Sequence, residues 1–180
     1  VPDCYADLGY RTISTNPCGE IPLCPYDSCR LLAINLFSYV DQPFTPQASF
    51  NFDKFRSHAQ LALRMMDDII DMEIEKVEHI LDKIKNDPEA GDIKHTEQVL
   101  WEKVLQACIN GRRTGVGITA EGDMLAALGL RYGSDEAIEF AVRVQRELAV
   151  NAYRSSVQLA RERGPFPIYD AAREMRNPFI

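Results

Sequence analysis

The chain has 180 residues, a net charge of −7 at pH 7 and a pI near 5.0, and 46% of its residues are hydrophobic. This length and composition are ordinary for one soluble globular domain, and the acidic balance argues against a nucleic-acid backbone or an anionic membrane as partner. Because the sequence has no run of 18 apolar residues and no signal-peptide pattern, we expect it to be cytoplasmic.

The first 51 residues are predicted to form a loop and one short strand. Residues 1–30 are rich in Pro, Cys and Gly and have little helical periodicity, with residues 11–14 as a candidate extended segment. The apolar run Leu31 to Leu36 follows. Residues 41–51, which contain two prolines, are expected to be a connector.

Residues 52–110 are predicted to be helical. Apolar residues recur at helical spacing from residue 52, which indicates one long helix or two in succession. Residues 86–91, with a proline and a glycine, break the pattern. Helical spacing returns at residues 96–110, and Gly111 is placed to end that helix. Its expected inward-facing positions are Val99, Leu100, Val104, Leu105 and Cys108.

The last part, residues 111–180, is predicted to be a strand followed by helices. Residues 114–119 alternate glycine with β-branched residues and indicate a buried strand. Their Gly-x-Gly pattern lacks the third glycine of a phosphate loop, so close packing is the better explanation. A short helix is expected at residues 121–128. A long one is expected from the N-cap Ser134 to Arg163, where glycine and proline follow. The apolar positions of this long helix include Ile138, Ala141, Val142, Leu148, Ala152, Val157 and Leu159.

The most informative stretch reads Asn-Pro-Cys-Gly-Glu at residues 16–20 and is followed by Cys29, eleven positions after Cys18. The side chains of Asn16, Cys18 and Glu20 alternate, so they would lie on one side of an extended segment. Such a polar group is costly to bury and of little use in a core. Cys18 can supply a thiolate or thiyl, Glu20 a base, and Asn16 both a donor and an acceptor.

The other cysteines carry no comparable pattern. The five cysteines include no Cys-x-x-Cys pair and no histidine at zinc-ligand spacing, which argues against structural zinc and against a dithiol redox protein. The odd count argues against a disulfide scaffold. We therefore interpret Cys4, Cys24 and Cys108 as structural residues.

The remaining polar clusters favour structural explanations. The acidic residues from Asp67 to Glu78, with His79, lack the Glu-x-x-His pair of di-iron helices, so a solvated helix face is expected and no metal site is predicted. His58 and His95 are interpreted as surface or packing residues. The arginine pair at residues 112–113 is expected to bind carboxylates rather than a phosphate.

Two blocks of this sequence resemble a known family. Residues 15–23 (Thr-Asn-Pro-Cys-Gly-Glu-Ile-Pro-Leu), Ser28-Cys29 and residues 33–36 are similar to the active-site loop of the large catalytic subunit of ribonucleotide reductases. Residues 112–134 match a second block, about a hundred residues on and in the family's order. The motif sequence Asn-Pro-Cys-Gly-Glu and the interval from Cys18 to Cys29 most resemble those of the adenosylcobalamin-dependent class II.

The resemblance implies a helix-rich α/β fold, a partial segment of the ten-stranded α/β barrel of these enzymes. Because the family's catalytic chains are several times longer, we expect residues 1–180 to be one internal fragment of the catalytic barrel domain. Its parts would be an active-site loop and short strand (1–51), helices (52–110), and a strand followed by helices (111–180).

By this resemblance, Cys18 is the thiyl radical that abstracts hydrogen from C3′ of a ribonucleotide. Glu20 would take the proton of the 3′-hydroxyl, and Asn16 would hold the sugar hydroxyls. Cys29 would supply one of two reducing equivalents and end as a disulfide, which a thioredoxin-like dithiol resets. The family's partner cysteine lies on an earlier strand, and the only cysteine upstream of Cys18 in this sequence is Cys4.

The radical source implied by the class is adenosylcobalamin, and the alternative within the family is a separate di-iron subunit. No cobalamin-binding residues can be assigned from the sequence. A different reading is a non-catalytic helical module, or half of a split reductase subunit, that needs a partner chain. Its signature would be an exposed apolar face covered by the rest of the catalytic chain or by a homo-oligomer.

Overall fold

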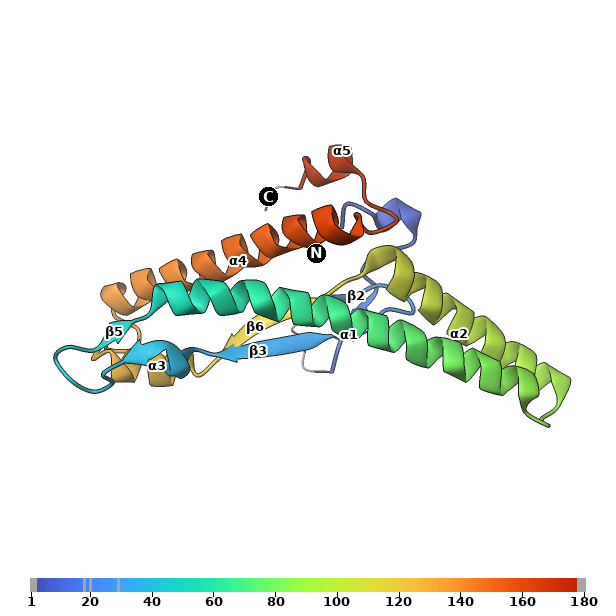
Figure 1. Cartoon of the computed structure of the whole chain (residues 1–180), viewed down its shortest axis with the longest axis horizontal. Helices are drawn as coiled ribbons and strands as arrows, with labels where there is room; N and C mark the ends of the chain where they lie inside the picture. The colour runs from blue at the N-terminus through green and yellow to red at the C-terminus, as the bar shows by residue number, and fades with distance from the viewer. Residues whose placement is uncertain (1–2, 18, 20, 29, 178–180) are drawn as a thin grey trace. The chain divides into compact units, whose positions relative to one another are not determined.

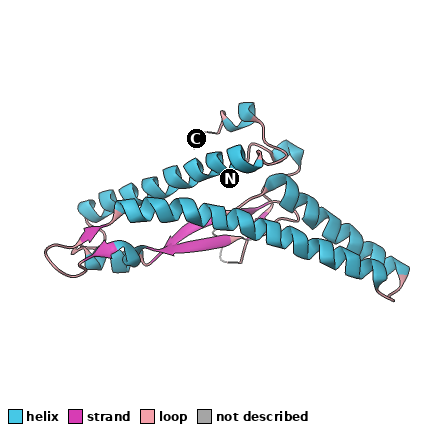
Figure 2. Ribbon diagram, viewed as in Figure 1, coloured by secondary structure: helices cyan, strands magenta, loops and turns pink. Residues whose placement is uncertain are grey.

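The computed structural model describes residues 3–17, 19, 21–28 and 30–177. Helices make up most of the described residues, and the strands are short (Figure 2). The chain divides into two compact units, each assembled from segments that are far apart in sequence. Unit 1 comprises Val1–Arg30, Asp67–Gly115 and Gly164–Ile180, and unit 2 comprises Leu31–Met66 and Val116–Arg163.

Unit 2 combines a strand pair, a small hairpin and long helices. Its elements are β3 (Leu31–Asn35), η2 (Leu36–Tyr39), β4 (Val40–Asp41), β5 (Ser49–Phe50), the first part of α1 (Phe52–Asn86), β6 (Gly115–Thr119), α3 (Glu121–Ala127) and α4 (Asp135–Arg163) (Figure 1). Strands β3 and β6 are hydrogen-bonded neighbours, and their arrows point the same way in Figure 1. β4 pairs antiparallel with β5. Two parallel strands joined by intervening helices are characteristic of α/β proteins.

Helix α1 begins where a side chain caps it. The Oδ1 atom of Asn51 accepts a hydrogen bond from the N–H of Lys54 at 3.0 Å, as an N-cap residue does. The apolar periodicity then sets the buried face of the helix. Its fully or nearly fully buried positions are Phe55, Ala59, Ala62, Met66, Ile70, Val77 and Ile84.

The core of unit 2 is aromatic where α1 starts. The ring of Phe55 lies 5.2 Å from that of Tyr39 and 5.4 Å from that of Phe50, both edge-on. Phe55 has no exposed surface. Edge-to-face rings at such distances add to the free energy gained by burying their area.

Unit 1 is held by a small hairpin and a helical hairpin. Its elements are η1 (Ala6–Leu8), β1 (Ser14–Thr15), β2 (Pro22–Leu23), the second part of α1, α2 (Gly91–Gly111) and α5 (Ala171–Glu174). β1 and β2 pair antiparallel. Tyr5, Tyr10 and Cys24 form a buried apolar cluster against which Phe166 and Ile168 pack.

Of the two alternatives expected from residue 52, the structure has one long helix, α1, and the expected break follows it at residues 87–90. The second helix, expected at residues 96–110, begins earlier, at Gly91. The end of α2 differs in detail, because the left-handed residue is Arg112 (φ 42°) and Gly111 is the last helical residue. A Cβ at Gly111 would lie 3.1 Å from Cε1 of Tyr10, so close packing explains this glycine. The inward position expected for Leu100 is wrong, since that side chain is 46% exposed.

The buried face of α4 differs from the apolar positions that stand out in its sequence. Ile138, Val142 and Val157 are more than half exposed. The buried positions of the helix are Ala137, Val144, Leu148, Asn151, Ser155 and Leu159. Two polar residues thus lie on the inner face of α4, while an apolar stripe is left on the outside.

The described residues form a helix-rich mixture of helices and strands, as expected, and none of their helices is long and apolar enough to cross a membrane.

Candidate functional site

The described residues of the predicted radical segment, Asn16, Pro17 and Gly19, come between β1 and β2. The backbone N–H of Asn16 donates to the carbonyl of Ile21 at 3.2 Å, and the N–H of Ile21 donates to Oδ1 of Asn16 at 2.9 Å. Gly19 donates to the carbonyl of Asn16 at 3.0 Å with φ at 81°, a backbone conformation that favours glycine. These described residues form a turn, not the extended segment expected, because proline and glycine favour turns.

Cys18, Glu20 and Cys29, the other residues of the predicted site, lie outside the described residues. Their expected grouping with Asn16 therefore stays a prediction. Asn16 itself is buried, with 7% of its surface exposed. Since its Oδ1 atom serves the turn, a contact from this side chain to a substrate would come from its Nδ2 donor.

Arg30, which directly follows Cys29 in sequence, is buried with 5% exposure. Its Nε donates to Oε2 of Glu73, and its Nη1 donates to the carbonyl of Arg113 at 3.0 Å and to Oδ1 of Asp27 at 3.4 Å. Its Nη2 approaches Sγ of Cys108 at 2.8 Å. Burial lowers the pKa of Arg30, but the hydrogen bond with Glu73 and the surrounding charges raise it further, so the guanidinium stays charged.

A cavity of about 390 Å³ in unit 1 borders both predicted catalytic segments. Ile21, Pro22 and Leu23 line it from the strand that follows residue 20. Ser28 and Arg30, the two neighbours of Cys29, also line it. The cavity thus brings together the described flanks of the radical segment and of the predicted reducing cysteine.

Charged groups along this cavity are paired. Nη1 of Arg113 lies 2.7 Å from Oδ2 of Asp3, and its Nε lies 3.9 Å from Oδ2 of Asp27. The thiol of Cys24 donates to Oδ2 of Asp27 at 3.5 Å. Burial, with a contribution from the Asp27 charge, raises the pKa of Cys24 to about 11. This thiol is therefore protonated at neutral pH and is a poor nucleophile.

The pKa values of the other two described cysteines, Cys4 and Cys108, are raised as well. Cys108 is fully buried, as expected for a residue on the inner face of α2, and burial raises the pKa of its thiol. Cys4 is half-buried, and its thiol donates to Oε1 of Glu174 at 3.8 Å. Burial also raises the pKa of Cys4. Neither environment provides an activated thiolate.

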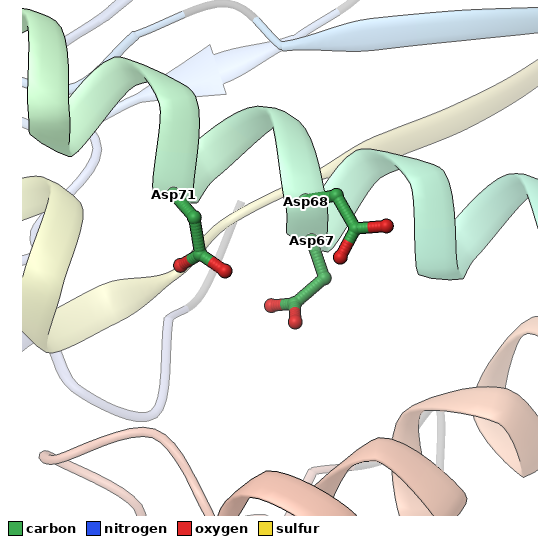
Figure 3. A group of neighbouring side chains, drawn as sticks. All are labelled: Asp67, Asp68 and Asp71. Atoms are coloured by element: carbon green, nitrogen blue, oxygen red, sulfur yellow. The ribbon is translucent and has the colours of Figure 1, made fainter.

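The acidic residues of α1 include a tight group, Asp67, Asp68 and Asp71, whose carboxylates lie within 4.8 Å of one another (Figure 3). Arg112 engages two of them: its Nη2 lies 2.7 Å from Oδ1 of Asp67, and its Nη1 lies 2.8 Å from Oδ1 of Asp71. The pairing expected for the two arginines is confirmed.

His58 also has the packing role expected for it. Its Nδ1 lies 3.0 Å from the hydroxyl of Tyr39, and the two rings meet edge-on at 5.6 Å.

Two cavities described in unit 1 are too small to hold a cobalamin. Cavities of about 300–1,000 Å³ suit drug-sized ligands, and a corrin with its nucleotide arm is far larger. Two cavities in unit 1 have volumes of about 390 and 500 Å³, in the lower half of that range.

The sequence did not single out Arg30, Asp27 or Glu73 as part of this region. One signal was available, because Arg30 is a charged residue between a cysteine and the apolar run of β3. A charged residue directly before an apolar strand needs a partner if it is buried with that strand. Its partner Glu73 could not be identified, because it lies 43 positions further along the chain.

The chain belongs to the ribonucleotide reductase family. The family model described as "Ribonucleotide reductase, barrel domain" matches residues 8–178.

Relatives within the family include enzymes whose names specify a cofactor. The chain is 32% identical over 167 residues to the vitamin B12-dependent ribonucleoside-diphosphate reductase of Mycobacterium tuberculosis, covering 93% of the chain and 20% of that relative. It is 35% identical over 156 residues to the Thermoplasma acidophilum protein of the same name, covering 87% and 17%. The ribonucleoside-diphosphate reductase subunit alpha of Chlamydia pneumoniae is 26% identical over 163 residues. The chain therefore spans about a fifth or less of the length of these curated relatives.

Proposed function

We propose that this chain is the part of a ribonucleotide reductase catalytic subunit that carries the radical cysteine, Cys18, and one reducing cysteine, Cys29. The observation that carries the proposal is the family match over residues 8–178, which includes both cysteines. The relatives named as ribonucleoside-diphosphate reductases favour diphosphates as substrates. The proposed location is the cytoplasm.

The proposed reaction replaces the 2′-hydroxyl of a ribonucleotide with hydrogen. The hydroxyl leaves as water, and two cysteine thiols, one of them Cys29, lose two electrons and two protons and form a disulfide. An external thioredoxin-like dithiol then reduces that disulfide by thiol–disulfide exchange. Cys18 in its thiyl form abstracts the C3′ hydrogen and returns a hydrogen at the end, so it is regenerated in each turnover.

The surrounding residues would orient the sugar. Glu20 is proposed to take the proton of the 3′-hydroxyl, which requires hydrogen-bond reach. Asn16 would donate from Nδ2, since its Oδ1 closes the hairpin turn. The cavity that borders the flanks of both segments is the proposed position of the ribose.

The proposed cofactor of the whole enzyme is adenosylcobalamin, which supplies a radical by homolysis of its Co–C bond. The names of two relatives favour it. We assign no residue of this chain to its binding, because neither of the two cavities described above is large enough for a corrin. The alternative is a separate di-iron subunit.

A second candidate is that the chain is a helical module, or half of a split subunit, that acts only with a partner. The apolar stripe of Ile138, Val142 and Val157 on the outside of α4 favours it, because such surfaces are normally covered. The partner would be the rest of the catalytic chain or a second copy.

The test uses a full-length catalytic subunit that contains this segment. It would be mixed anaerobically with a dithiol and each ribonucleoside diphosphate or triphosphate, with adenosylcobalamin or with an iron subunit. We expect deoxynucleotide formation that depends on adenosylcobalamin, with a cob(II)alamin–thiyl EPR signal. Product only with the iron subunit would overturn the cofactor assignment, and no product with either would overturn the proposed function.

A further inference from the structure

The charged side chain of Arg30 is buried, and burying a charge costs free energy because the charge loses its hydration. The side chain is 2% exposed. Moving an ionised group out of water costs several kcal/mol unless its partners replace the lost hydration. Here the partners are the carboxylates of Glu73 and Asp27, the carbonyl of Arg113 and the sulfur of Cys108. These residues come from the second part of α1, from α2 and from the segment after α2, so the guanidinium joins several segments of unit 1.

The same contacts fix the chain on both sides of Cys29. Oδ1 of Asp27 accepts the backbone N–H of Ser28 at 2.9 Å, and it also lies 3.4 Å from Nη1 of Arg30. One carboxylate therefore holds the residue before Cys29 and the residue after it. On the far side, the carbonyl of Arg30 accepts the N–H of Gly115 at 2.8 Å, which ties this point to the start of β6.

Stability alone does not account for this arrangement well. Replacing a buried ion pair by apolar residues of similar volume is often neutral or stabilising, so such pairs are weak evidence for a stabilising role. Unit 2 has another arginine–glutamate pair, Arg56 with Glu147, in which Nε and Nη2 donate to the two carboxylate oxygens at 2.7 and 2.9 Å. That pair lies at the surface between helices, with Arg56 36% exposed.

We propose that Arg30, held by Glu73 and Asp27, is a positioning residue for Cys29. It fixes the backbone on both sides of the reducing cysteine, so that the thiol meets its partner cysteine as the substrate is reduced. This inference rests on the proposed function. In that reaction the two thiols give up two electrons and two protons, an S–S bond forms, and the 2′-hydroxyl leaves as water. Such a step needs a precise sulfur position, since a displacement of about 1 Å can cost about a hundredfold in rate.

The experiment compares Arg30→Met, Arg30→Lys and Glu73→Gln in the full-length reductase, with Arg56→Met as the matched control. The first measurement is the deoxynucleotide made in a single turnover by pre-reduced enzyme without added dithiol. The second is the amplitude of the Cys18-dependent radical signal. Far-UV CD and thermal melting check that each variant is folded, and the milder Arg30→Lys and Glu73→Gln variants carry the test if Arg30→Met fails to fold.

For Arg30→Met, we expect the single-turnover rate to fall about tenfold to a hundredfold. KM should stay within about twofold, because the guanidinium of Arg30 directs its hydrogen bonds to Glu73, Asp27, Arg113 and Cys108 and not to the cavity proposed for the ribose. The radical signal should keep its wild-type amplitude, since the hydrogen-bond partners of the Arg30 side chain do not include residues 14–23 among the described residues. Arg30→Lys should recover part of the rate, because it keeps the charge but loses the planar fork. Arg56→Met should react like the wild type.

Folded Arg30 and Glu73 variants with wild-type single-turnover rates would overturn the inference and leave the proposed function intact. Equal loss of the radical signal and of product would also overturn it, because that result indicates a general structural role. A wild-type enzyme that makes no deoxynucleotide would overturn the proposed function and this inference with it.

Discussion

At the scale of single residues, Tyr5 links the beginning and the end of unit 1. Its hydroxyl donates to Oε1 of Glu174 at 2.7 Å and accepts the N–H of Asp170 at 3.2 Å. Its ring packs edge-on against Phe166 at 5.8 Å. Burial, together with the hydrogen bond to the Glu174 carboxylate, raises the pKa of Tyr5 to about 12.

This raised pKa predicts a loss of stability at alkaline pH. In the unfolded chain Tyr5 releases its proton near pH 10, but in the folded chain only near pH 12. The contribution of Tyr5 to the free energy of unfolding is therefore complete below pH 10. About 2–3 kcal/mol of it is lost as the pH rises to 12. The free energy of unfolding, measured by urea denaturation between pH 10 and pH 12, should fall more steeply with pH for the wild type than for Tyr5→Phe. Equal slopes for the two proteins would contradict the prediction.

The sequence identified the residue types of the candidate site but not how each is used. The residues 16–20 were recognisable because a thiol, a carboxylate and a carboxamide alternate there. The use of Asn16 Oδ1 in the turn was not predictable, because it depends on the chain returning at Ile21. Two partners of Arg30, Glu73 and the carbonyl of Arg113, lie 43 and 83 positions away, which no local pattern reveals.

At the scale of elements, α4 contacts α1 through polar groups. Nε2 of Gln60 donates to Oδ1 of Asn151 at 3.0 Å, and the hydroxyl of Ser155 donates to the carbonyl of Gln60 at 2.8 Å. Nδ2 of Asn151 donates to the carbonyl of Glu147 at 2.8 Å. The polar inner positions of α4 are therefore satisfied by hydrogen bonds, as buried polar groups must be.

We predict that Asn151→Ala lowers the free energy of unfolding by about 1–3 kcal/mol, because it leaves the amide of Gln60 without its acceptor next to a cavity. Asn151 is 1% exposed. The matched control is Val157→Ala on the outer face of the same helix, which should change stability by no more than about 0.5 kcal/mol. Urea denaturation measures both. A larger loss for Val157→Ala would mean that the outer face of α4 is the stabilising one.

Element boundaries were predictable where capping and stop residues mark them. Ser134 before α4 and Gly164 after it gave both ends of that helix. The buried face of α4 was not predictable from its own sequence. Whether its apolar residues or the pair Asn151 and Ser155 face inward depends on the groups that α1 offers as partners. The four-residue helix α5 was missed, since it is too short to show a period.

At the scale of the whole molecule, two compact units differ in what holds them. Unit 2 has an extended apolar core that includes Phe55 and Leu148. Unit 1 has a smaller apolar cluster and ion pairs such as Arg112 with Asp67. The barrel family was recognisable from motifs, but the division into units was not, because each unit is made of segments distant in sequence.

We predict that the two units lose their structure in separate steps, as cooperative units of a native protein often do. Phe55→Ala should cost about 3–5 kcal/mol in unit 2 because it empties part of the core. Hydrogen exchange should then be accelerated by about a hundredfold or more in α4 of unit 2, and much less in α2 of unit 1. Equal acceleration in both helices would show that the chain opens as one unit.

The central claim is that Cys18 performs the radical step of ribonucleotide reduction. The most direct test is the deoxynucleotide made by a full-length reductase containing this segment, with Cys18→Ser compared against Cys24→Ser. Both replace a thiol by a hydroxyl of similar size, but Cys24 is a buried, protonated thiol with no proposed role in the reaction. We expect no product from folded Cys18→Ser and near wild-type product from Cys24→Ser. Substantial product from Cys18→Ser would contradict the account.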